Sequence, residues 1–149
     1  MRHRWAALSL VLALCYVPGV RSAQSGSRRP GGQGSLKQNY PNPFNPETRI
    51  PFNIGDPANC QDLGRTYRAT LKIYNLLSQV VAIPVLQGGS GNVAGGQSLE
   101  NVPLSCGTYQ AFWDGKYLST AREVASGIYF YQLVIDGKVV DSRKMLVAK

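Results

Sequence analysis

Histidine is almost absent from this 149-residue sequence. The one histidine, His3, lies in an N-terminal segment with the features of a secretion signal, so the predicted mature chain has none. Its absence removes the commonest general base and the commonest metal ligand of proteins. Nucleophilic catalysis by serine–histidine or cysteine–histidine pairs is therefore excluded.

The sequence also lacks an apolar run long enough to cross a membrane. The N-terminal run, residues 5–17, has 13 residues, whereas a span needs about 20. A cationic head precedes this run, a Pro-Gly pair breaks it, and residues 20–22 fit cleavage after Ser22. We predict a signal peptide over residues 1–22, with an uncleaved anchor and a lipoprotein as alternatives. The chain would then be exported to the periplasm, the outer surface or the medium, and would contact a membrane only through this signal.

Acidic residues are scarce, because eight Asp and Glu stand against 16 Lys and Arg. Three basic residues lie in the signal peptide, which leaves 13 basic and eight acidic residues, a net charge of +5. Apart from the pairs Arg28-Arg29 and Arg143-Lys144, the positive charge is spread out and does not alternate with aromatic residues. This pattern predicts no nucleic-acid partner.

Only three cysteines are present, and Cys15 would leave with the signal peptide. An even pair in an exported chain is typical of a disulfide, so we predict a bond between Cys60 and Cys106. Two free thiols are the alternative. Neither cysteine lies in a CxxC motif, which disfavours a zinc site and redox catalysis.

The rest of the chain divides into a linker and one domain. Residues 23–35 are rich in Gly, Ser, Arg and Pro and hold no large apolar side chain, so we predict a disordered linker there. Residues 36–149 are long enough for one domain with one core. Two stretches of this domain, residues 55–65 and 87–105, are predicted to be long loops that the disulfide would tie together.

Apolar residues in the predicted domain recur with a period of two rather than 3.6. This alternation predicts strands over residues 48–54, 67–74, 79–85, 109–113, 127–135 and 139–147. Asp136-Gly137 separates the last two and favours a type I′ hairpin turn. Because no amphipathic helix is indicated, we predict an all-β fold, an antiparallel β-sandwich of about seven strands.

Several possible functional sites have a simpler structural explanation. The segment GGSGNVAGG lacks the ending of a phosphate loop and no helix follows it, so a surface loop is favoured. No acidic residues have calcium-loop spacing, and Asp114 and Asp136 are better explained as turn residues. We predict that the chain is not an enzyme and uses no cofactor or metal.

Aromatic residues offer one alternative binding site. Trp113, Tyr129, Phe130 and Tyr131 would form either a sugar-stacking platform or part of the sandwich core. Alternation places Phe130 on the side opposite Tyr129 and Tyr131, so one side of this strand is expected to be exposed.

Four motifs occur in order along the predicted domain. NYPNPFNPETRIPF begins at Asn39, LKIYN at Leu71 and GTYQAFWDG at Gly107, and VASGIYFYQLVIDGKVVDSRKMLVAK ends at Lys149. Together they resemble the type A C-terminal sorting domain of the type IX secretion system, which is similar to the immunoglobulin-like domain of the FlgD hook-capping protein. The resemblance covers residues 36–149 and implies an immunoglobulin-like form of the β-sandwich.

The resemblance assigns two groups of residues. Its family motif corresponds to Asn42, Pro43, Phe44, Asn45, Pro46, Trp113, Asp114, Gly115, Ser126, Gly127, Ile128 and Tyr129. The sorting signal read at the outer membrane corresponds to Lys144, Met145, Leu146, Val147 and Lys149.

The function that the resemblance implies is non-enzymatic. The domain would be a C-terminal sorting or cell-surface targeting module, recognised by secretion and attachment proteins through strand edges and a surface patch. Only the linker, residues 23–35, stands between the predicted signal and the domain, so a passenger to be sorted is not evident. Three explanations remain open: a truncated remnant, a free-standing immunoglobulin-like protein, or a FlgD-like role in assembling a surface appendage, with its subunits as partners. A sugar-binding surface module is an alternative of a different class.

Overall fold

The computed structural model describes residues 33–62, 64–88 and 94–149. These residues form two antiparallel sheets packed against each other, and their only helical element is the 3-10 turn Pro57–Asn59. The predicted all-β sandwich is confirmed. No helix in the described part of the chain is long and apolar enough to span a bilayer. The predicted signal peptide and most of the predicted linker lie outside the described residues.

The first sheet has the strand order β1-β2-β7-β5. Its strands are β1 (Gly34–Leu36), β2 (Thr48–Ile54), β7 (Gly107–Trp113) and β5 (Val85–Leu86). β2 has the predicted bounds because every second residue from Thr48 to Ile54 is buried, and this is the pattern of a strand with one face on the core.

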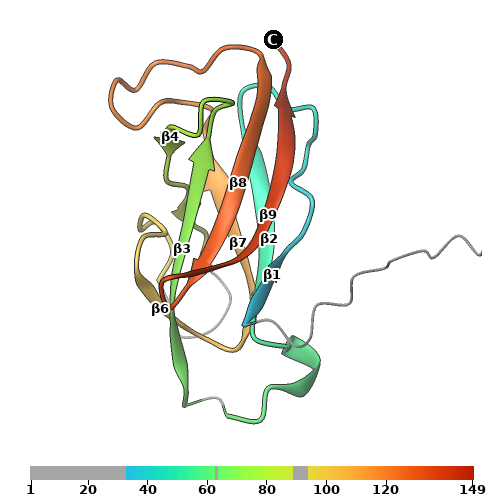
Figure 1. Ribbon diagram of the computed structural model, residues 1–149, viewed down its shortest axis with the longest axis vertical. Helices are drawn as coiled ribbons and strands as arrows, with labels where there is room; N and C mark the ends of the chain where they lie inside the picture. The colour runs from blue at the N-terminus through green and yellow to red at the C-terminus, as the bar shows by residue number, and fades with distance from the viewer. Residues whose placement is uncertain (1–32, 63, 89–93) are drawn as a thin grey trace, which may run out of the picture.

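The second sheet has the order β4-β3-β8-β9, and β6 pairs with the first half of β3. Its strands are β4 (Val80–Ala82), β3 (Thr66–Tyr74), β8 (Gly127–Ile135), β9 (Lys138–Val147) and β6 (Val102–Ser105). Asp136 and Gly137 join β8 to β9 with φ angles of 50° and 78°, as the predicted type I′ turn requires. In Figure 1 the strands β3, β8 and β9 lie in front of β2 and β7.

Three expectations about the elements are corrected. β1 begins at Gly34, inside the predicted linker, because its backbone pairs with β2 and a side chain at Gly34 would overlap the carbonyl oxygen of Asn53. β6 lies inside the predicted loop 87–105, where Val102 and Leu104 are buried. The predicted strand 79–85 is two short strands, β4 and β5, that belong to different sheets. The described residues therefore contain nine strands rather than about seven.

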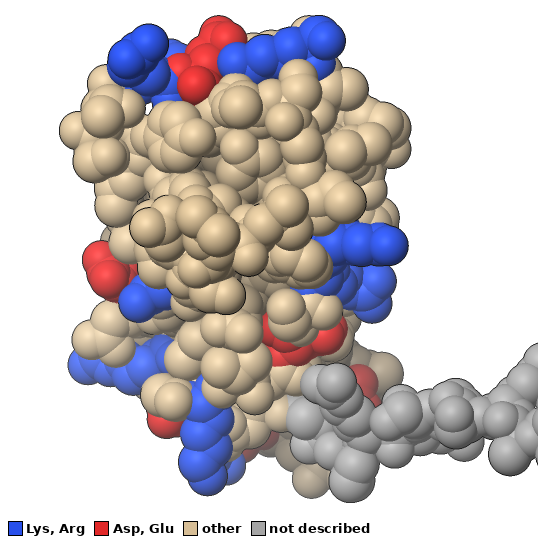
Figure 2. Space-filling view, turned by 45° about the horizontal axis from the view of Figure 1, so that its top comes forward, with Lys and Arg blue, Asp and Glu red and all other residues tan. Residues whose placement is uncertain are grey.

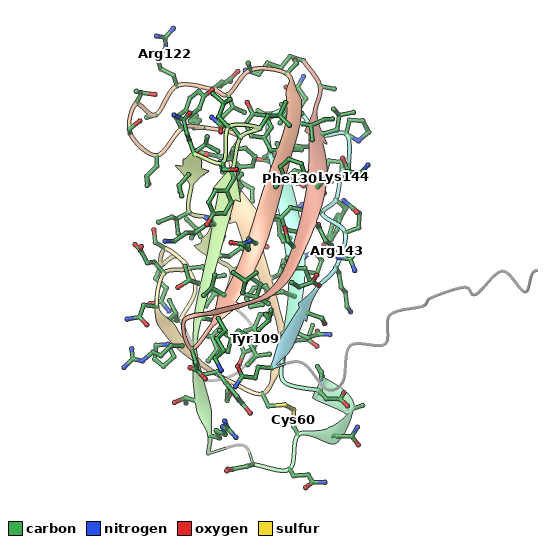
Figure 3. The ribbon with its side chains drawn as sticks, in the orientation of Figure 1. Cys60, Tyr109, Arg122, Phe130, Arg143 and Lys144 are labelled. Atoms are coloured by element: carbon green, nitrogen blue, oxygen red, sulfur yellow. A yellow bond between two sulfur atoms is a disulfide. The ribbon has the colours of Figure 1, made fainter. Side chains whose placement is uncertain are left out.

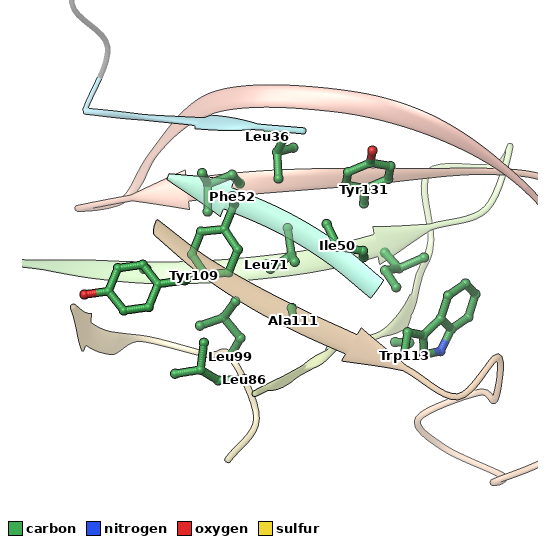
Figure 4. Packing of buried hydrophobic residues seen from close by; sticks show 14 of the residues in the cluster. Leu36, Ile50, Phe52, Leu71, Leu86, Leu99, Tyr109, Ala111, Trp113 and Tyr131 are labelled. Carbon is green, nitrogen blue, oxygen red and sulfur yellow. The ribbon is translucent and has the colours of Figure 1, made fainter. Parts of the chain in front are cut away.

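The core lies between the two sheets and follows the alternation of the strands (Figure 4). Ile50 and Phe52 of the first sheet and Leu71 and Tyr131 of the second are all essentially inaccessible to solvent. Burial of each such side chain contributes about 1.5–3 kcal/mol to folding. Large apolar side chains thus account for the sandwich without any ligand.

A polar network joins the two sheets at the side where β1 lies near β9. The Tyr131 hydroxyl donates to the Lys37 carbonyl at 2.8 Å and accepts from the Asn39 amide at 3.1 Å. The Asn39 side chain, itself buried, donates to Thr48 Oγ1 at 3.0 Å. These bonds satisfy the buried polar groups and fix the segment that leads into the Asn42–Pro46 motif.

Candidate functional site

The residues assigned from the resemblance fall in four segments, residues 42–46, 113–115, 126–129 and 144–149. These segments meet at one end of the sandwich, called here the motif end. The Phe44 ring packs edge to face on Trp113 with 5.4 Å between the ring centroids, and Trp113 packs on Tyr129 at 5.9 Å. Phe44 also forms a parallel bridge with Val147. In Figure 1 this is the end at which the chain terminates. Segments more than 100 residues apart are therefore brought into one cluster.

The opening motif covers the outer edge of β9. Phe44 N donates to the Leu146 carbonyl at 3.1 Å, and Ala148 N donates to the Phe44 carbonyl at 3.0 Å. Asn42 Oδ1 accepts a bond from Leu146 N at 3.0 Å. Of the five residues of this motif only Phe44 is buried, and the exposed ones are Asn42, Pro43, Asn45 and Pro46. Residues 42–46, called here the clasp, therefore place one side chain, that of Phe44, in the core and their backbone along the edge of β9.

The terminal motif is split between the core and the surface. Met145 and Val147 are buried, with 1% and 2% of their surface exposed. Lys144, Leu146 and Lys149 are exposed. Only these three are available to a partner, while the other two hold the end of β9 in the sandwich.

The last residue is held in place by two bonds. Lys149 Nζ lies 2.8 Å from Glu123 Oε2, and Lys149 N donates to Ser126 Oγ at 3.1 Å. The hydrogen bond from Lys149, and then its positive charge, lower the pKa of Glu123. Beside this pair lies an open hollow of about 500 Å³, and Tyr117 and Arg122 contribute to its lining. The basic ending is thus presented in a defined position.

The middle motif, Trp113-Asp114-Gly115, forms a tight turn after β7. Trp113 Nε1 donates to the Lys116 carbonyl at 3.0 Å, and Asp114 Oδ1 accepts from Lys116 N at 3.1 Å. The prediction that Asp114 is a turn residue is confirmed. Gly115 has a φ of 72°, and a β-carbon on it would overlap the Pro46 carbonyl oxygen. The turn and the opening motif are therefore packed backbone to backbone.

Replacing Gly115 with alanine is expected to lower the free energy of unfolding by about 2–5 kcal/mol, because left-handed backbone strain adds to the overlap with Pro46. Gly137 provides a matched control, since its φ is 78° and nothing lies within 4 Å of its β-carbon position. The same substitution there should cost only the strain, about 1–2 kcal/mol. Urea unfolding of both variants measures the difference, and equal losses would contradict the close packing on Pro46.

Residues 126–129, the third segment along the chain, place Tyr129 toward the core and Ile128 toward the solvent. The Tyr129 hydroxyl donates to the Ala125 carbonyl at 3.0 Å. Burial, together with the neighbouring Tyr117, raises the pKa of Tyr129 to about 12. Burial also raises the pKa of Tyr131. Ile128, between the motif's glycine and Tyr129, is 44% exposed. The two tyrosines are therefore neutral structural groups, whereas Ile128 is free to contact a partner.

The aromatic platform suggested for sugar binding is not formed. Trp113, Tyr129 and Tyr131 are buried in the core, with at most 5% of their surface exposed. Phe130 points to the opposite side, as alternation predicts, and is exposed. Three of the four aromatic rings are thus unavailable for stacking on a sugar, because they are needed to fill the space between the sheets.

The disulfide lies at the opposite end of the sandwich. Cys60 and Cys106 are bonded with their Cα atoms 5.7 Å apart, in agreement with the sequence prediction. Figure 3 shows Cys60 near the lower end of the molecule and Lys144 in its upper half. The bond ties the segment after β2 to the start of β7, so it belongs to the scaffold and not to the motif end.

Sequence reasoning missed one surface next to the motif end. Phe130 and Leu146 face outward from the second sheet together with Tyr74 and Val80. The alternating pattern indicated which side of each strand is outward, but it did not show which strands are neighbours. Within the described residues, no group of His, Cys, Asp or Glu could hold a metal ion.

Comparisons with known proteins identify no family. No family model matches the chain, and no curated protein matches it. Among solved structures, the chain is similar to Pseudomonas fluorescens alkylpurine DNA glycosylase AlkC bound to DNA containing an abasic site analog. The TM-score is 0.42 at 9% sequence identity, and the match covers 80% of this chain and 31% of that chain. This chain therefore spans about a third of the length of the protein it matches, and a likeness this weak indicates neither fold nor function.

Proposed function

We propose that this chain is a non-enzymatic, exported module that acts as a C-terminal sorting or surface-targeting domain of the type IX secretion type. The observation that carries the proposal is the contact of the motif segments at one end, where Phe44, Trp113, Tyr129 and Val147 pack together. A single recognition end requires this arrangement, in which the segments that carry the resemblance lie side by side. The disulfide is compatible with an oxidising compartment outside the cytosol.

The clasp gives the proposed signal a physical form. Because the opening motif holds the edge of β9, the exposed residues Lys144, Leu146 and Lys149 are fixed on a folded domain and not carried on a loose tail. Binding of a receptor to these residues would cost little conformational entropy in this domain, because the strand that carries them is already fixed. Secretion and attachment proteins are the partners that this proposal implies.

A fusion experiment tests the proposed function. An inert passenger is inserted after residue 32 of the full chain and expressed in a bacterium with a type IX system. Deletion of the last six residues would be a poor test, because it removes Met145 and Val147 from the core. Lys144→Ala combined with Lys149→Ala changes only exposed side chains, and Lys138→Ala on the same strand is the control.

The proposal expects passenger at the surface or in the medium with the wild-type domain and with Lys138→Ala. With the double variant it expects the passenger to be retained in the periplasm. Circular dichroism should show that the domain of this variant keeps the wild-type fold. Retention of the wild-type fusion with a folded domain would overturn the proposal. The assembly role in a surface appendage would then be the better explanation.

A further inference from the structure

The outer face of the second sheet carries a row of apolar side chains. Val80, Tyr74 and Phe130 are register partners across β4, β3 and β8, and Lys144 of β9 continues the row. Ile128 and Leu146 form the next pair toward the motif end. With Leu76 from the β3–β4 turn, the apolar residues make up the sheet patch, which consists of Tyr74, Leu76, Val80, Ile128, Phe130 and Leu146.

The sheet patch is exposed and hollowed. The exposed fraction is 37% for Phe130 and 67% for Leu76. A hollow of about 330 Å³ is lined by the apolar or aromatic residues Tyr74, Leu76 and Phe130 and by the polar residues Asn75, Ser78, Gln132 and Ser142. Figure 2 shows a broad surface without charged side chains, with both basic and acidic side chains at its margins. A contiguous apolar surface of this kind marks an interaction site, and a hollow in it suits an anchoring side chain of a partner.

Near the motif end, both edges of the second sheet are hydrogen-bonded to other segments of the chain. At the motif end, the outer edge of β9 is covered by the clasp, which occupies both the N–H and the carbonyl of Leu146. On the other side of the sheet, the Val81 carbonyl accepts a bond from Leu118 N. Addition of a partner strand is blocked at these positions. At these positions the outer face, and not the strand edge, is thus the accessible surface.

The charges around the sheet patch indicate the chemistry of the partner. The outward residues of β3, β8 and β9 next to the sheet patch include the basic residues Lys72 and Lys144 and no acidic residue. Neither lysine has an ion-pair partner among the described residues. A second copy would place positive charge against positive charge, and so few basic groups give weak attraction to an anionic membrane.

We propose that the sheet patch docks a protein partner whose own surface is apolar with acidic groups at its rim. This inference rests on the proposed function, because the partner would be the component that reads the sorting domain. One anchoring side chain of the partner would enter the hollow beside Phe130, and its carboxylates would face Lys72 and Lys144. Ile128 and Leu146 connect this surface to the motif end.

The passenger fusion in the full chain tests the inference with four variants. Phe130→Thr removes an apolar contact while keeping a residue that favours strands, and Val139→Thr, at a 56% exposed position of β9 outside the sheet patch, is its control. Lys144→Glu reverses a charge beside the patch, and Lys138→Glu is its control at the other end of β9. We expect Phe130→Thr and Lys144→Glu to lower surface passenger about tenfold or more, with both controls near wild type and all four folded.

The outcomes separate the inference from the proposed function. Retention of the wild-type fusion overturns both. Wild-type export with unchanged export of Phe130→Thr overturns only the docking surface, because Phe130, unlike Lys144, is not part of the proposed sorting signal. Two further measurements can also overturn the choice of partner. A dimer in analytical ultracentrifugation that Phe130→Thr abolishes would assign the patch to a second copy. Cosedimentation with phosphatidylglycerol vesicles that Lys144→Glu abolishes would assign it to a membrane.

Discussion

Replacing Phe44 with alanine is expected to lower the free energy of unfolding by about 3–5 kcal/mol. Its side chain is 1% exposed and its ring packs on Trp113, so truncation leaves a cavity at the motif end. The surrounding groups can collapse little, because the N–H and the carbonyl of Phe44 are hydrogen-bonded to Leu146 and Ala148. Denaturant unfolding followed by tryptophan fluorescence measures the loss, since Trp113 reports directly on this contact.

Tyr40→Ala is the matched control for Phe44→Ala. Tyr40 lies in the same segment but is 49% exposed, and its hydroxyl accepts one surface hydrogen bond from Gln110. We expect this variant to lose less than about 1 kcal/mol. A similar small loss for Phe44→Ala would mean that the clasp is not anchored in the core. The surface sites Lys144 and Leu146 would then lack the fixed position that the proposed function requires.

Local sequence patterns were sufficient for the strands with strict alternation. β2 and β8 have the predicted bounds because each buries every second residue against one core. The Asp136-Gly137 turn was predictable because few dipeptides adopt two successive positive φ angles without strain. In both cases the information lies within a few neighbouring residues.

Pairing between distant segments could not be predicted in the same way. β1 and β6 are short, and glycine or proline obscures their alternation, so their partners β2 and β3 define them as strands. The change of sheet between β4 and β5 likewise depends on the strands β3 and β7 that receive them. Short strands of this type gain their stability from tertiary pairing and not from local preference.

The candidate site was only partly predictable for the same reason. The resemblance pointed to Phe44, Trp113 and Lys144, but the sequence did not show that Met145 and Val147 belong to the core and not to a readable signal. Alternation placed Phe130 outward, yet the sheet patch exists only because register brings Tyr74 and Leu146 beside that strand. A surface assembled from several strands requires knowledge of the pairing.

Replacing both Cys60 and Cys106 with serine is expected to lower the free energy of unfolding by about 4 kcal/mol. The bond spans 46 residues, and a crosslink of this length removes much conformational entropy from the unfolded chain. Both cysteines are only partly buried, so serine itself should cost little. Urea unfolding of the oxidised wild type, the reduced wild type and the double variant measures the effect. Unfolding of all three at the same urea concentration would contradict a stabilising bond.

Loss of the disulfide is expected to lower the stability of the domain without affecting its recognition by the secretion machinery. The bond lies at the end of the sandwich opposite the motif end, and neither cysteine contributes to the sheet patch. A double variant that remains folded at the growth temperature should therefore deliver its passenger as the wild type does, although it unfolds more easily. Phe130→Thr should show the reverse, with little loss of stability and a large loss of export. If the folded cysteine variant were retained in the periplasm, the recognised surface would have to include the disulfide end, and the assignment to the motif end would be wrong.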